Sequence, residues 1–492
     1  MAELLALVKH DCPVCTQLMP ALDAARDGGA PLRVLSQSDA ADTDRWTEQL
    51  GLHHPPELDL DLVVSQRHDP EAVPTLLLLD DGEERGRVEG LDREALVRLA
   101  ARAGVALDLS GLPAHRPGCA SLTRDPRVAP RLAVRRARAE GRLRSRTLPI
   151  GDHEDAHEAL LERGLTDGLP VVPPSAERVV AMLEGTSRHP QEVVATVPPY
   201  LAEATVEKVA VNSVMAGCTP EMLPVVLAAV EAACDPLFAL HGLLATTHPA
   251  GPLVVVSGAI GDRIGMNSAG NALGQGNRAN LSIGRALQLV VRNIGGGRPQ
   301  VEDRAAHGQM GKLGACFAER RRDSPFAPLG VDLGFDAAET TVTLFAAEAP
   351  RLIIDQLSRE PEGLARSLAA ALVGVGHPKL CLAFDALVVV GPEHGRVLRE
   401  AGWDRGRLQA RLHELTTRPG GGLVQGADGM PEGVPAAWVG DASAPLPKFL
   451  SPDRIVVVHA GGDAGLFSMV FGSWVSGEMG STPVTRRVDT WT

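Results

Sequence analysis

Hydrophobic positions in the first hundred residues alternate between strand-like and helix-like spacing. Residues 4–8 are continuously apolar, whereas the apolar side chains between residues 16 and 25 recur with the period of a helix. Further along, two apolar runs flank the turn Asp80-Asp81-Gly82, as in a hairpin. The expected elements are, in order, a strand at 4–8, a helix at 16–25, strands at 76–79 and up to Val88, and a helix at 92–103. This pattern predicts an α/β unit over residues 1–108.

Two cysteines stand where the first strand meets the first helix, in Cys12-Pro13-Val14-Cys15. The unpaired N–H groups and the positive dipole end of a helix start favour a thiolate, so we expect Cys12 to be a nucleophile. Cys15 lies one turn further and can attack a mixed disulfide formed at Cys12. A zinc site is the alternative, but it needs a second ligand pair, and the nearby histidines lack the spacing for one. The motif therefore predicts a redox-active Cys12–Cys15 disulfide, with no metal and no bound cofactor.

This stretch resembles the thioredoxin superfamily, and its Cys-Pro-x-Cys is closer to glutaredoxins than to thioredoxin itself. The resemblance includes Val73-Pro74-Thr75 before the strand at 76–79, and it covers about residues 1–105. In that family the proline after the long loop is cis and faces the redox pair, so the resemblance gives Pro74 this role. It also implies thiol–disulfide oxidoreductase activity, with a thiol reductant or a reductase as partner. No tryptophan precedes Cys12, so the potential and the partner cannot be copied from the family.

Residues 109–150 differ in composition from what precedes them. Ten arginines fall between Arg116 and Arg146, against only two acidic residues. We interpret this segment as an Arg-rich, solvated linker with one short helix, and a basic docking segment is the alternative. Cys119, in Pro117-Gly118-Cys119, is expected to be a loop thiol, although its position close to the first domain leaves a third redox role open.

Residues 151–492 predict one large α/β body, with a division into two lobes left open. Three strands, at 252–257, 386–390 and 454–459, each end in a glycine-containing loop. Ligands of open α/β sheets bind at the carboxyl ends of strands. We therefore expect one cleft whose walls are the loop at 258–278, Glu393 with His394, and His459 with Ser468.

Cys218 is a second thiol expected at a helix start. A helical pattern over 203–217 ends before it, and Thr219-Pro220-Glu221 then has the sequence of a cap and a first turn. Lys208 can approach Cys218 if the preceding helix folds back, and Asn212 is the polar residue on the same helix. The pattern makes Cys218 a candidate nucleophile with Lys208 and Asn212 as substrate contacts, while a buried, inert thiol is the alternative.

The loop at 258–278 contains many glycines and asparagines between a strand and a helix. This arrangement can hold an anion at a helix N-terminus, but its spacing matches neither a P-loop nor a dinucleotide fingerprint. We interpret it as a pocket for a small polar or carboxylate-bearing ligand, and an ordered structural loop is the alternative. The expected substrate-binding residues are Asn267, Asn271, Arg278 and His459.

Composition narrows the classes of partner and compartment. The formal net charge is −13, which argues against nucleic acid or an anionic membrane as the main partner. No apolar run is long enough to span a membrane, and the first residues do not form a signal peptide. Seven sparse cysteines fit a reducing cytoplasm better than a disulfide framework. The expected partners are a small-molecule substrate and a thiol reductant, and a homo-oligomer is left open.

The C-terminal body resembles an uncharacterised bacterial family associated with cysteine- or selenocysteine-dependent redox proteins. The residues that carry this resemblance are Glu203–Lys208, Asn212, Met215 to Glu221 and the glycine-asparagine loop.

The first functional hypothesis is a redox enzyme in which the thioredoxin-like domain serves a fused body. That body binds a small polar, sulfur-containing or soft-metal substrate and uses Cys218. The second hypothesis is a general thiol–disulfide oxidoreductase fused to a ligand- or partner-binding module without catalysis. The third is a lyase or hydrolase body with a regulatory redox domain.

Overall fold

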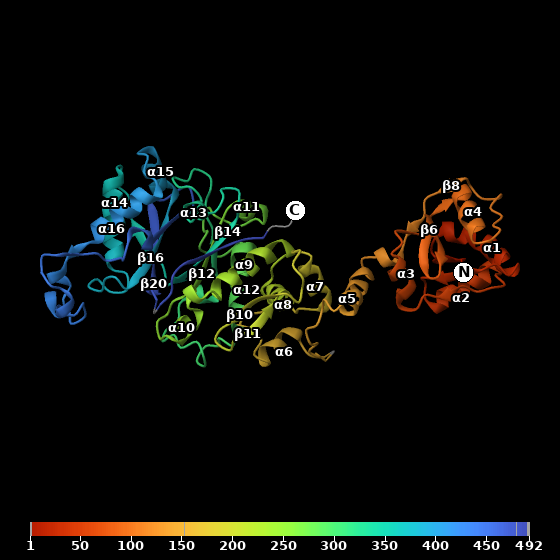
Figure 1. Cartoon of the computed structure of the whole chain (residues 1–492), viewed down its shortest axis with the longest axis horizontal. Coiled ribbons are helices and arrows are strands. Elements are labelled where there is room, and N and C mark those ends of the chain that lie inside the picture. The colour runs from red at the N-terminus through yellow and green to blue at the C-terminus, as the bar shows by residue number, and fades with distance from the viewer. Residues whose placement is uncertain (1, 152, 479, 490–492) are drawn as a thin grey trace. The chain divides into compact units, whose positions relative to one another are not determined.

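The computed structural model describes residues 2–151, 153–478 and 480–489, and it divides into two compact units, Met1–Ala139 and Glu140–Thr492 (Figure 1). We call them unit 1 and unit 2. Each has its own hydrophobic core, as expected for independent domains.

Unit 1 is built on a five-stranded sheet with the order β3-β2-β1-β5-β6. The central strand β1 pairs in parallel with β2 and antiparallel with β5, and its residues 4–8 are buried on both faces. The predicted strand, helix, hairpin and closing helix are all confirmed. The main elements are β1 (Ala2–Val8), α1 (Pro13–Asp27), β2 (Leu32–Ser36), α2 (Ala40–Leu50), β3 (Glu57–Leu58), α3 (Val63–His68), β4 (Ala72–Val73), β5 (Thr75–Asp80), β6 (Glu83–Glu89), β7 (Leu91–Asp92) and α4 (Arg93–Arg102).

Unit 1 extends 31 residues beyond the boundary expected at residue 108 (139 − 108). The segment predicted as a linker forms β8 (His115–Arg116), β9 (Cys119–Ala120) and α5 (Ala129–Ala139). Strand β8 pairs with β7, and β9 pairs with β4. The Arg135 guanidinium donates to Gln66 Oε1 at 2.8 Å. The linker prediction is therefore wrong up to residue 139, because several of its arginines bond to groups of unit 1.

Unit 2 contains an eight-stranded sheet with the order β13-β12-β14-β20-β16-β19, to which β15 and β21 add at β20 and β14. Strands β14 and β20 join the two halves through the pair Ala347 and Ser473. The strands are β12 (Gly251–Ser257), β13 (Ala315–Ala318), β14 (Thr341–Ala347), β15 (Arg351–Ile354), β16 (Phe384–Val390), β19 (Ile455–His459), β20 (Phe467–Val475) and β21 (Val484–Arg487), with a separate hairpin of β10 (Val193–Val197) and β11 (Ala202–Thr205).

Alternate residues of these strands belong to different cores. In β12, Val254 and Val256 pack with the helices on one face, while Leu253 and Val255 belong to a core shared with the other half-sheet. Helices therefore cover one face of each half-sheet, and the opposite faces share a core, which confirms a mixed α/β body. The helices are α6 (Ala156–Glu162), α7 (Ala176–Leu183), α8 (Val206–Ala216), α9 (Leu223–Ala233), α10 (Leu240–Ala245) and α12 (Arg278–Asn293) in the first half, and α14 (Pro361–Val373), α15 (Pro392–Glu400) and α16 (Arg405–Thr416) in the second.

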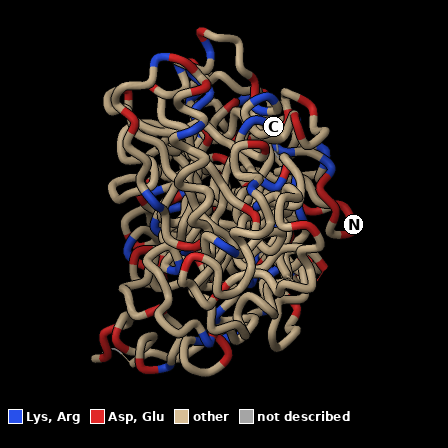
Figure 2. The backbone as a smooth tube through the Cα atoms, turned by 90° about the vertical axis from the view of Figure 1, so that its left-hand side faces the viewer, with Lys and Arg blue, Asp and Glu red and all other residues tan. Residues whose placement is uncertain are grey.

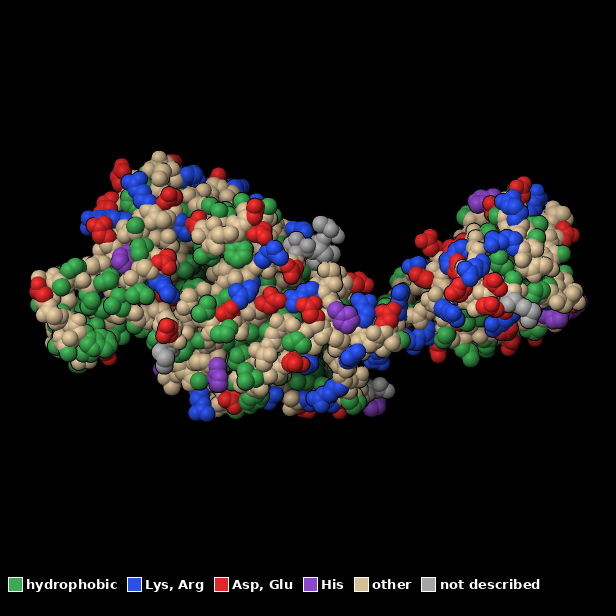
Figure 3. Space-filling model, in the orientation of Figure 1, with side chains coloured by type: hydrophobic (Ala, Val, Ile, Leu, Met, Phe, Trp, Pro, Cys, Tyr) green, Lys and Arg blue, Asp and Glu red, His purple; other side chains and the backbone are tan. Residues whose placement is uncertain are grey.

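The surface shows how charge and hydrophobic side chains are distributed. Basic and acidic residues are interspersed in the view of Figure 2. Hydrophobic side chains gather at the left end of Figure 3, and exposed apolar residues after α16 include Trp438, which is 76% exposed. Among the described residues, no single helix is long and apolar enough to cross a membrane, and one pair passes only when joined across a 69° bend.

Candidate functional site

Cys12 is the N-cap of α1, and its position follows from the sequence around it. Strand β1 ends at Val8, the backbone of Cys12 is extended, and Pro13 opens the helix without needing a hydrogen-bond acceptor for its nitrogen. The Cys12 sulfur accepts the backbone N–H of Cys15 at 3.3 Å. Strand β1 and helix α1 thus place both sulfurs at the start of the helix.

The two thiols of this motif have opposite acidities. The Cys15 thiol, as a hydrogen-bond donor, contributes most to lowering the pKa of Cys12 to about 5, against the opposing effect of burial. The Cys15 N–H, then the thiol and backbone of Cys119, lower it further. Burial, followed by the nearby Cys12 charge, raises the pKa of Cys15 well above its usual value. Cys12 is therefore a thiolate at neutral pH, and Cys15 holds a proton.

The residues before β5 form the opposite wall of the site. The Val73–Pro74 peptide bond is cis, as the resemblance implied for Pro74. The carbonyl oxygen of Val73 lies 3.3 Å from the Cys12 sulfur and accepts a hydrogen bond from it when Cys12 is a thiol. This contact favours the protonated form, so it opposes the groups that lower the pKa of Cys12.

Cys119 is the residue that sequence reasoning undervalued. It lies in β9, directly opposite Val73 of β4, and it lowers the pKa of Cys12. Cys12 and Cys15 are 0% exposed, whereas Cys119 is partly exposed. Strands of two residues have no periodicity that a sequence pattern can reveal, so only the short distance in sequence to the first domain pointed to Cys119.

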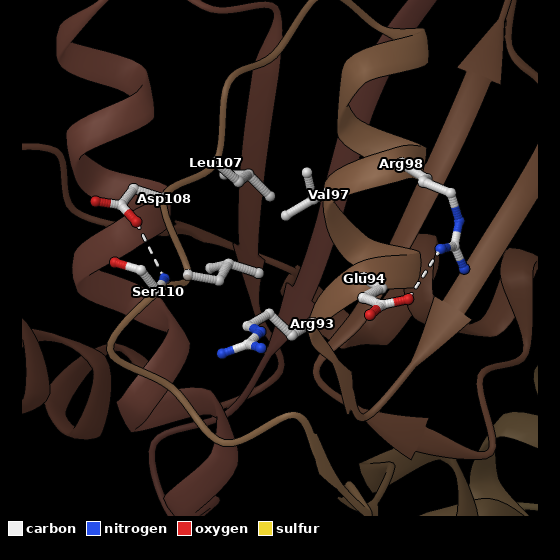
Figure 4. Close-up of a pocket in the computed structure, with 8 residues that line it drawn as sticks. Arg93, Glu94, Val97, Arg98, Leu107, Asp108 and Ser110 are labelled. Atoms are coloured by element: carbon white, nitrogen blue, oxygen red, sulfur yellow. Dashed lines mark hydrogen bonds and ion pairs between the residues drawn. The ribbon is translucent and has the colours of Figure 1, made fainter.

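A hollow of about 560 Å³ also lies in unit 1, between α4 and residues 107–110 (Figure 4). Its polar contacts are local: Arg98 pairs with Glu94 at 3.4 Å, and Asp108 accepts the N–H of Ser110 at 3.0 Å. No cysteine lines this hollow, so it is not part of the redox site.

Cys218 in unit 2 is not activated in the way the sequence suggested. It follows Gly217, the C-cap of α8, and precedes Thr219, which caps a short 3₁₀ turn before α9. Its side chain is 6% exposed, and burial raises its pKa to about 12, with only a small opposing effect of Arg278. This environment stabilises the thiol and argues against a nucleophilic thiolate.

The predicted companions of Cys218 bond elsewhere. Lys208 donates to the carbonyl oxygen of Glu203 at 2.8 Å, in the first turn of α8, whereas Cys218 follows the last turn. Asn212 is buried and accepts from Asn293 at 2.8 Å. Arg278 does lie near Cys218, because it donates to the carbonyl oxygen of Gly217 at 2.7 Å. Lys208 and Asn212 thus have structural bonds and do not converge on the thiol.

Part of the predicted cleft is present at the ends of β16 and β19. A cavity of about 400 Å³ is lined by Asn271–Gly274 of the glycine-asparagine loop, by Gly391 and Pro392, by residues 460–462, 464 and 465, and by Ser468. Asn271 lines it while donating to Gln275. Asn267 donates to Gly270 and, like Arg278, does not line the cavity. The structure therefore brings together the glycine loops of this cleft and only one of the three predicted loop residues.

His459 is buried away from this cavity. Its Nδ1 lies 3.2 Å from the carbonyl oxygen of Arg320, and burial lowers its pKa. Of the other predicted walls, Ser468 lines the cavity, whereas Glu393 and His394 do not. Ser468 Oγ nevertheless lies 2.8 Å from His394 Nδ1. His394 Nε2 lies 2.9 Å from the carbonyl oxygen of Asp355, which fixes Nδ1 as the acceptor. The sequence placed both residues at the cleft but did not pair them.

No group of three or more metal-ligating side chains occurs within residues 2–151, 153–478 and 480–489. The expectation of no metal or cofactor stays a prediction.

Among known proteins, only solved structures match this chain, and they match over a segment of it. No protein-family model matches the chain, and no curated protein matches it. A segment is similar to StoA from Bacillus subtilis, at 17% identity and a TM-score of 0.18, over 20% of this chain and 82% of that one. A secreted Mycobacterium tuberculosis disulfide oxidoreductase, homologous to E. coli DsbE, matches at 16% identity with a TM-score of 0.18. The match covers 20% of this chain and 81% of that one. A thioredoxin-like protein in its oxidized form matches at 20% identity with a TM-score of 0.19, over 21% of this chain and 76% of that one.

One of these three proteins is described as a disulfide oxidoreductase and another as thioredoxin-like. Each of the three matches covers about a fifth of this chain. The family resemblance of unit 2 stays a prediction, since no match bears on it.

Proposed function

We propose that this protein is a thiol–disulfide oxidoreductase whose chemistry is carried out by Cys12 and Cys15 in unit 1. The observation that supports this most is the pair of opposed acidities, a thiolate at Cys12 beside a protonated Cys15 at a helix start. The redox-active disulfide is then the only redox group that unit 1 needs, and a thiol or a reductase supplies electrons.

The reaction follows from this geometry. The Cys12 thiolate attacks one sulfur of a disulfide substrate, releases the first thiol and forms a mixed disulfide. Cys15 then loses its proton and attacks the Cys12 sulfur, which releases the second thiol and leaves the Cys12–Cys15 disulfide. An external thiol or reductase restores both thiols. Pro74, next to the Val73 carbonyl that contacts Cys12, positions the substrate against the sulfur.

For unit 2 we propose a ligand- or partner-binding role, with the cavity at the ends of β16 and β19 taking a small polar molecule. Two observations favour this over catalysis by Cys218: the burial of that thiol and its raised pKa. We propose the cytoplasm as the compartment, which the sparse cysteines of the chain support. The net charge of −13 supports partners other than nucleic acid or membrane.

The test is reduction of a small disulfide, bis(2-hydroxyethyl) disulfide, coupled to a thiol reductant, with the full-length protein. We expect Cys12→Ser to reduce the rate to the uncatalysed level, and Cys218→Ser to leave it unchanged. Full activity of Cys12→Ser contradicts the proposal, and loss of activity in Cys218→Ser restores the hypothesis of a nucleophile in unit 2.

A second candidate function is hydrolysis or elimination in unit 2, and the Ser468–His394 pair favours it. A hydroxyl bonded to a histidine that is oriented by a carbonyl oxygen has the geometry of an activated nucleophile. A fluorophosphonate probe that labels Ser468, and fails to label His394→Gln, supports it. An unlabelled Ser468 in the native protein rules out a serine nucleophile.

A further inference from the structure

A short segment of unit 1 covers the redox pair. We call residues 115–121 the strap. Its two strands pair at both ends, β8 with β7 and β9 with β4. The N–H of Ser121 then donates to the carbonyl oxygen of Glu71 at 3.1 Å. The strap thus occupies the free edge of β4, next to cis-Pro74, where an extended peptide would otherwise add a strand.

The strap fits this edge because Gly118 has no side chain. A Cβ on Gly118 would lie 2.7 Å from the carbonyl oxygen of Val73 and 2.9 Å from the Cβ of Ala72. From the other side, a Cβ on Gly90 would lie 2.8 Å from the nitrogen of Gly118. Such distances are too short for any Cβ, so the close approach of the strap depends on glycine at residue 118.

This fit places Cys119 against Cys12. Val73 contacts both cysteines: its carbonyl oxygen lies 3.3 Å from the Cys12 sulfur, and its backbone is the register partner of Cys119. Under the strap Cys12 and Cys15 are 0% exposed, and Cys119 is the partly exposed thiol of the three. An external thiol that approaches from solvent therefore meets Cys119 first.

We propose that Cys119 is a third redox-active thiol, which exchanges with Cys15 as the disulfide partner of Cys12 and presents the oxidised pair to the external thiol reductant. This inference depends on the proposed function, because the oxidation of Cys12 comes from the disulfide substrate. It adds which sulfur atom the external reductant attacks.

The exchange needs no oxidant beyond that substrate. Deprotonated Cys119 attacks the Cys12 sulfur of the Cys12–Cys15 disulfide, so the bond from Cys12 to Cys15 breaks and one from Cys12 to Cys119 forms. Cys15 leaves as a thiolate and takes up the proton that Cys119 lost. An external thiolate then attacks the Cys119 sulfur and expels Cys12 as a thiolate. A second external thiol reduces the resulting mixed disulfide at Cys119.

The acidities of Cys12 and Cys119 agree with attack of the external thiol at Cys119. In thiol–disulfide exchange the thiol of lower pKa leaves faster. The pKa of Cys12 is lowered to about 5, while burial raises the pKa of Cys119. An attack at the Cys119 sulfur therefore expels the better leaving group.

The experiment uses the full-length Cys15→Ser protein, which leaves Cys119 as the nearby partner of Cys12. The protein is treated with bis(2-hydroxyethyl) disulfide, quenched with acid and digested with trypsin. We expect a disulfide between the peptides 10–26 and 103–124, which carry Cys12 and Cys119. A Cys119→Ser change in this background should abolish the cross-link and leave the mixed disulfide on Cys12. The matched control is Cys381→Ser, another partly exposed thiol but in unit 2, which should leave the cross-link intact.

Adding cysteamine to the cross-linked protein then tests the entry point. We expect the cysteamine label on peptide 103–124. A label on peptide 10–26, or a mixed disulfide at Cys12 that persists while Cys119 is free, overturns the inference but leaves the proposed function standing. A protein in which Cys12 forms no mixed disulfide and no cross-link contradicts the proposed function, and the inference falls with it.

Discussion

Cys12 and Cys218 both stand just before a helical segment, and burial acts on both, yet the structure gives them opposite acidities. Cys12 is itself the N-cap of α1 and accepts the N–H of Cys15. At Cys218 the cap is the next residue, Thr219, and the backbone N–H of Cys218 donates back to Ser213 in α8. The Cys12 sulfur therefore receives the hydrogen bonds that stabilise a thiolate. At Cys218, burial raises the pKa and outweighs the opposing charge of Arg278. Proximity to a helix start thus does not activate a thiol unless the sulfur itself accepts the free N–H groups.

The largest effect expected from this contrast is in alkylation. At pH 7 the thiolate fraction of Cys12 exceeds that of Cys218 by about 10⁵, and the weaker nucleophilicity of a low-pKa thiolate reduces the rate ratio to about a hundredfold. As the pH rises, the Cys12 rate should level off above its pKa of about 5, while that of Cys218 climbs towards pH 12.

Iodoacetamide labelling followed by peptide mass spectrometry measures both rates in one sample. The side chains are similarly covered, at 0% and 6% exposure, so access does not favour Cys12. Equal alkylation rates of Cys12 and Cys218 at pH 7 would contradict their opposite acidities.

A second expected effect tests whether the strap limits access of reagents to Cys12. Gly118→Val in the Cys15→Ser background should push the strap from β4 and make alkylation of Cys12 severalfold faster, because the new side chain meets the Val73 carbonyl oxygen and Ala72. The matched control is Gly111→Val, just before the strap in the chain, where a Cβ has no atom within 4 Å. Circular dichroism of both variants checks that unit 1 stays folded. An unchanged rate in Gly118→Val would mean that the strap does not limit access.

The sequence was informative where the chemistry is local. An apolar run, a Cys-x-x-Cys and a helical pattern occupy consecutive residues, so β1, Cys12 and α1 could be predicted, and the resemblance placed cis-Pro74. The contact of Cys119 with this site comes from pairing between two-residue strands 46 residues apart in the chain (119 − 73). No hydrophobic period specifies such a pair, and the many arginines around it suggested a solvated linker instead.

In unit 2 the glycine loops at strand ends were predictable for the same local reason, and they do line a cavity. The hydrogen-bond partners of the side chains around these loops could not be predicted. Asn267 and Arg278 satisfy their hydrogen bonds within the loop and with Gly217, and the Ser468–His394 pair joins residues 74 apart. Residue type indicates which groups can bond, but tertiary packing decides which of them remain available to a ligand.

A third expected effect concerns the origin of the Cys12 acidity. Cys15→Ala should raise the pKa of Cys12 from about 5, because the Cys15 thiol is the largest contribution to lowering it. The backbone N–H of Cys15 remains in this variant, so the pKa should stay below that of an ordinary thiol. A pH titration of the ultraviolet thiolate absorbance measures the change. An unchanged pKa would transfer the stabilising role to the helix start alone.

The smallest effect expected is that of Cys119 on the same titration. Cys119→Ala should raise the pKa of Cys12 by less than Cys15→Ala does, because the Cys119 thiol ranks below the Cys15 thiol and N–H among the groups that lower it. Cys119→Ser, whose hydroxyl still donates, should raise it less again. If Cys119→Ala instead matches Cys15→Ala, the strap contributes as much to the thiolate as the helix does. The difference between Cys12 and Cys218 would then reflect the strap as well as the cap, because two thiols lower the pKa of Cys12, whereas Arg278 is the group that lowers the pKa of Cys218.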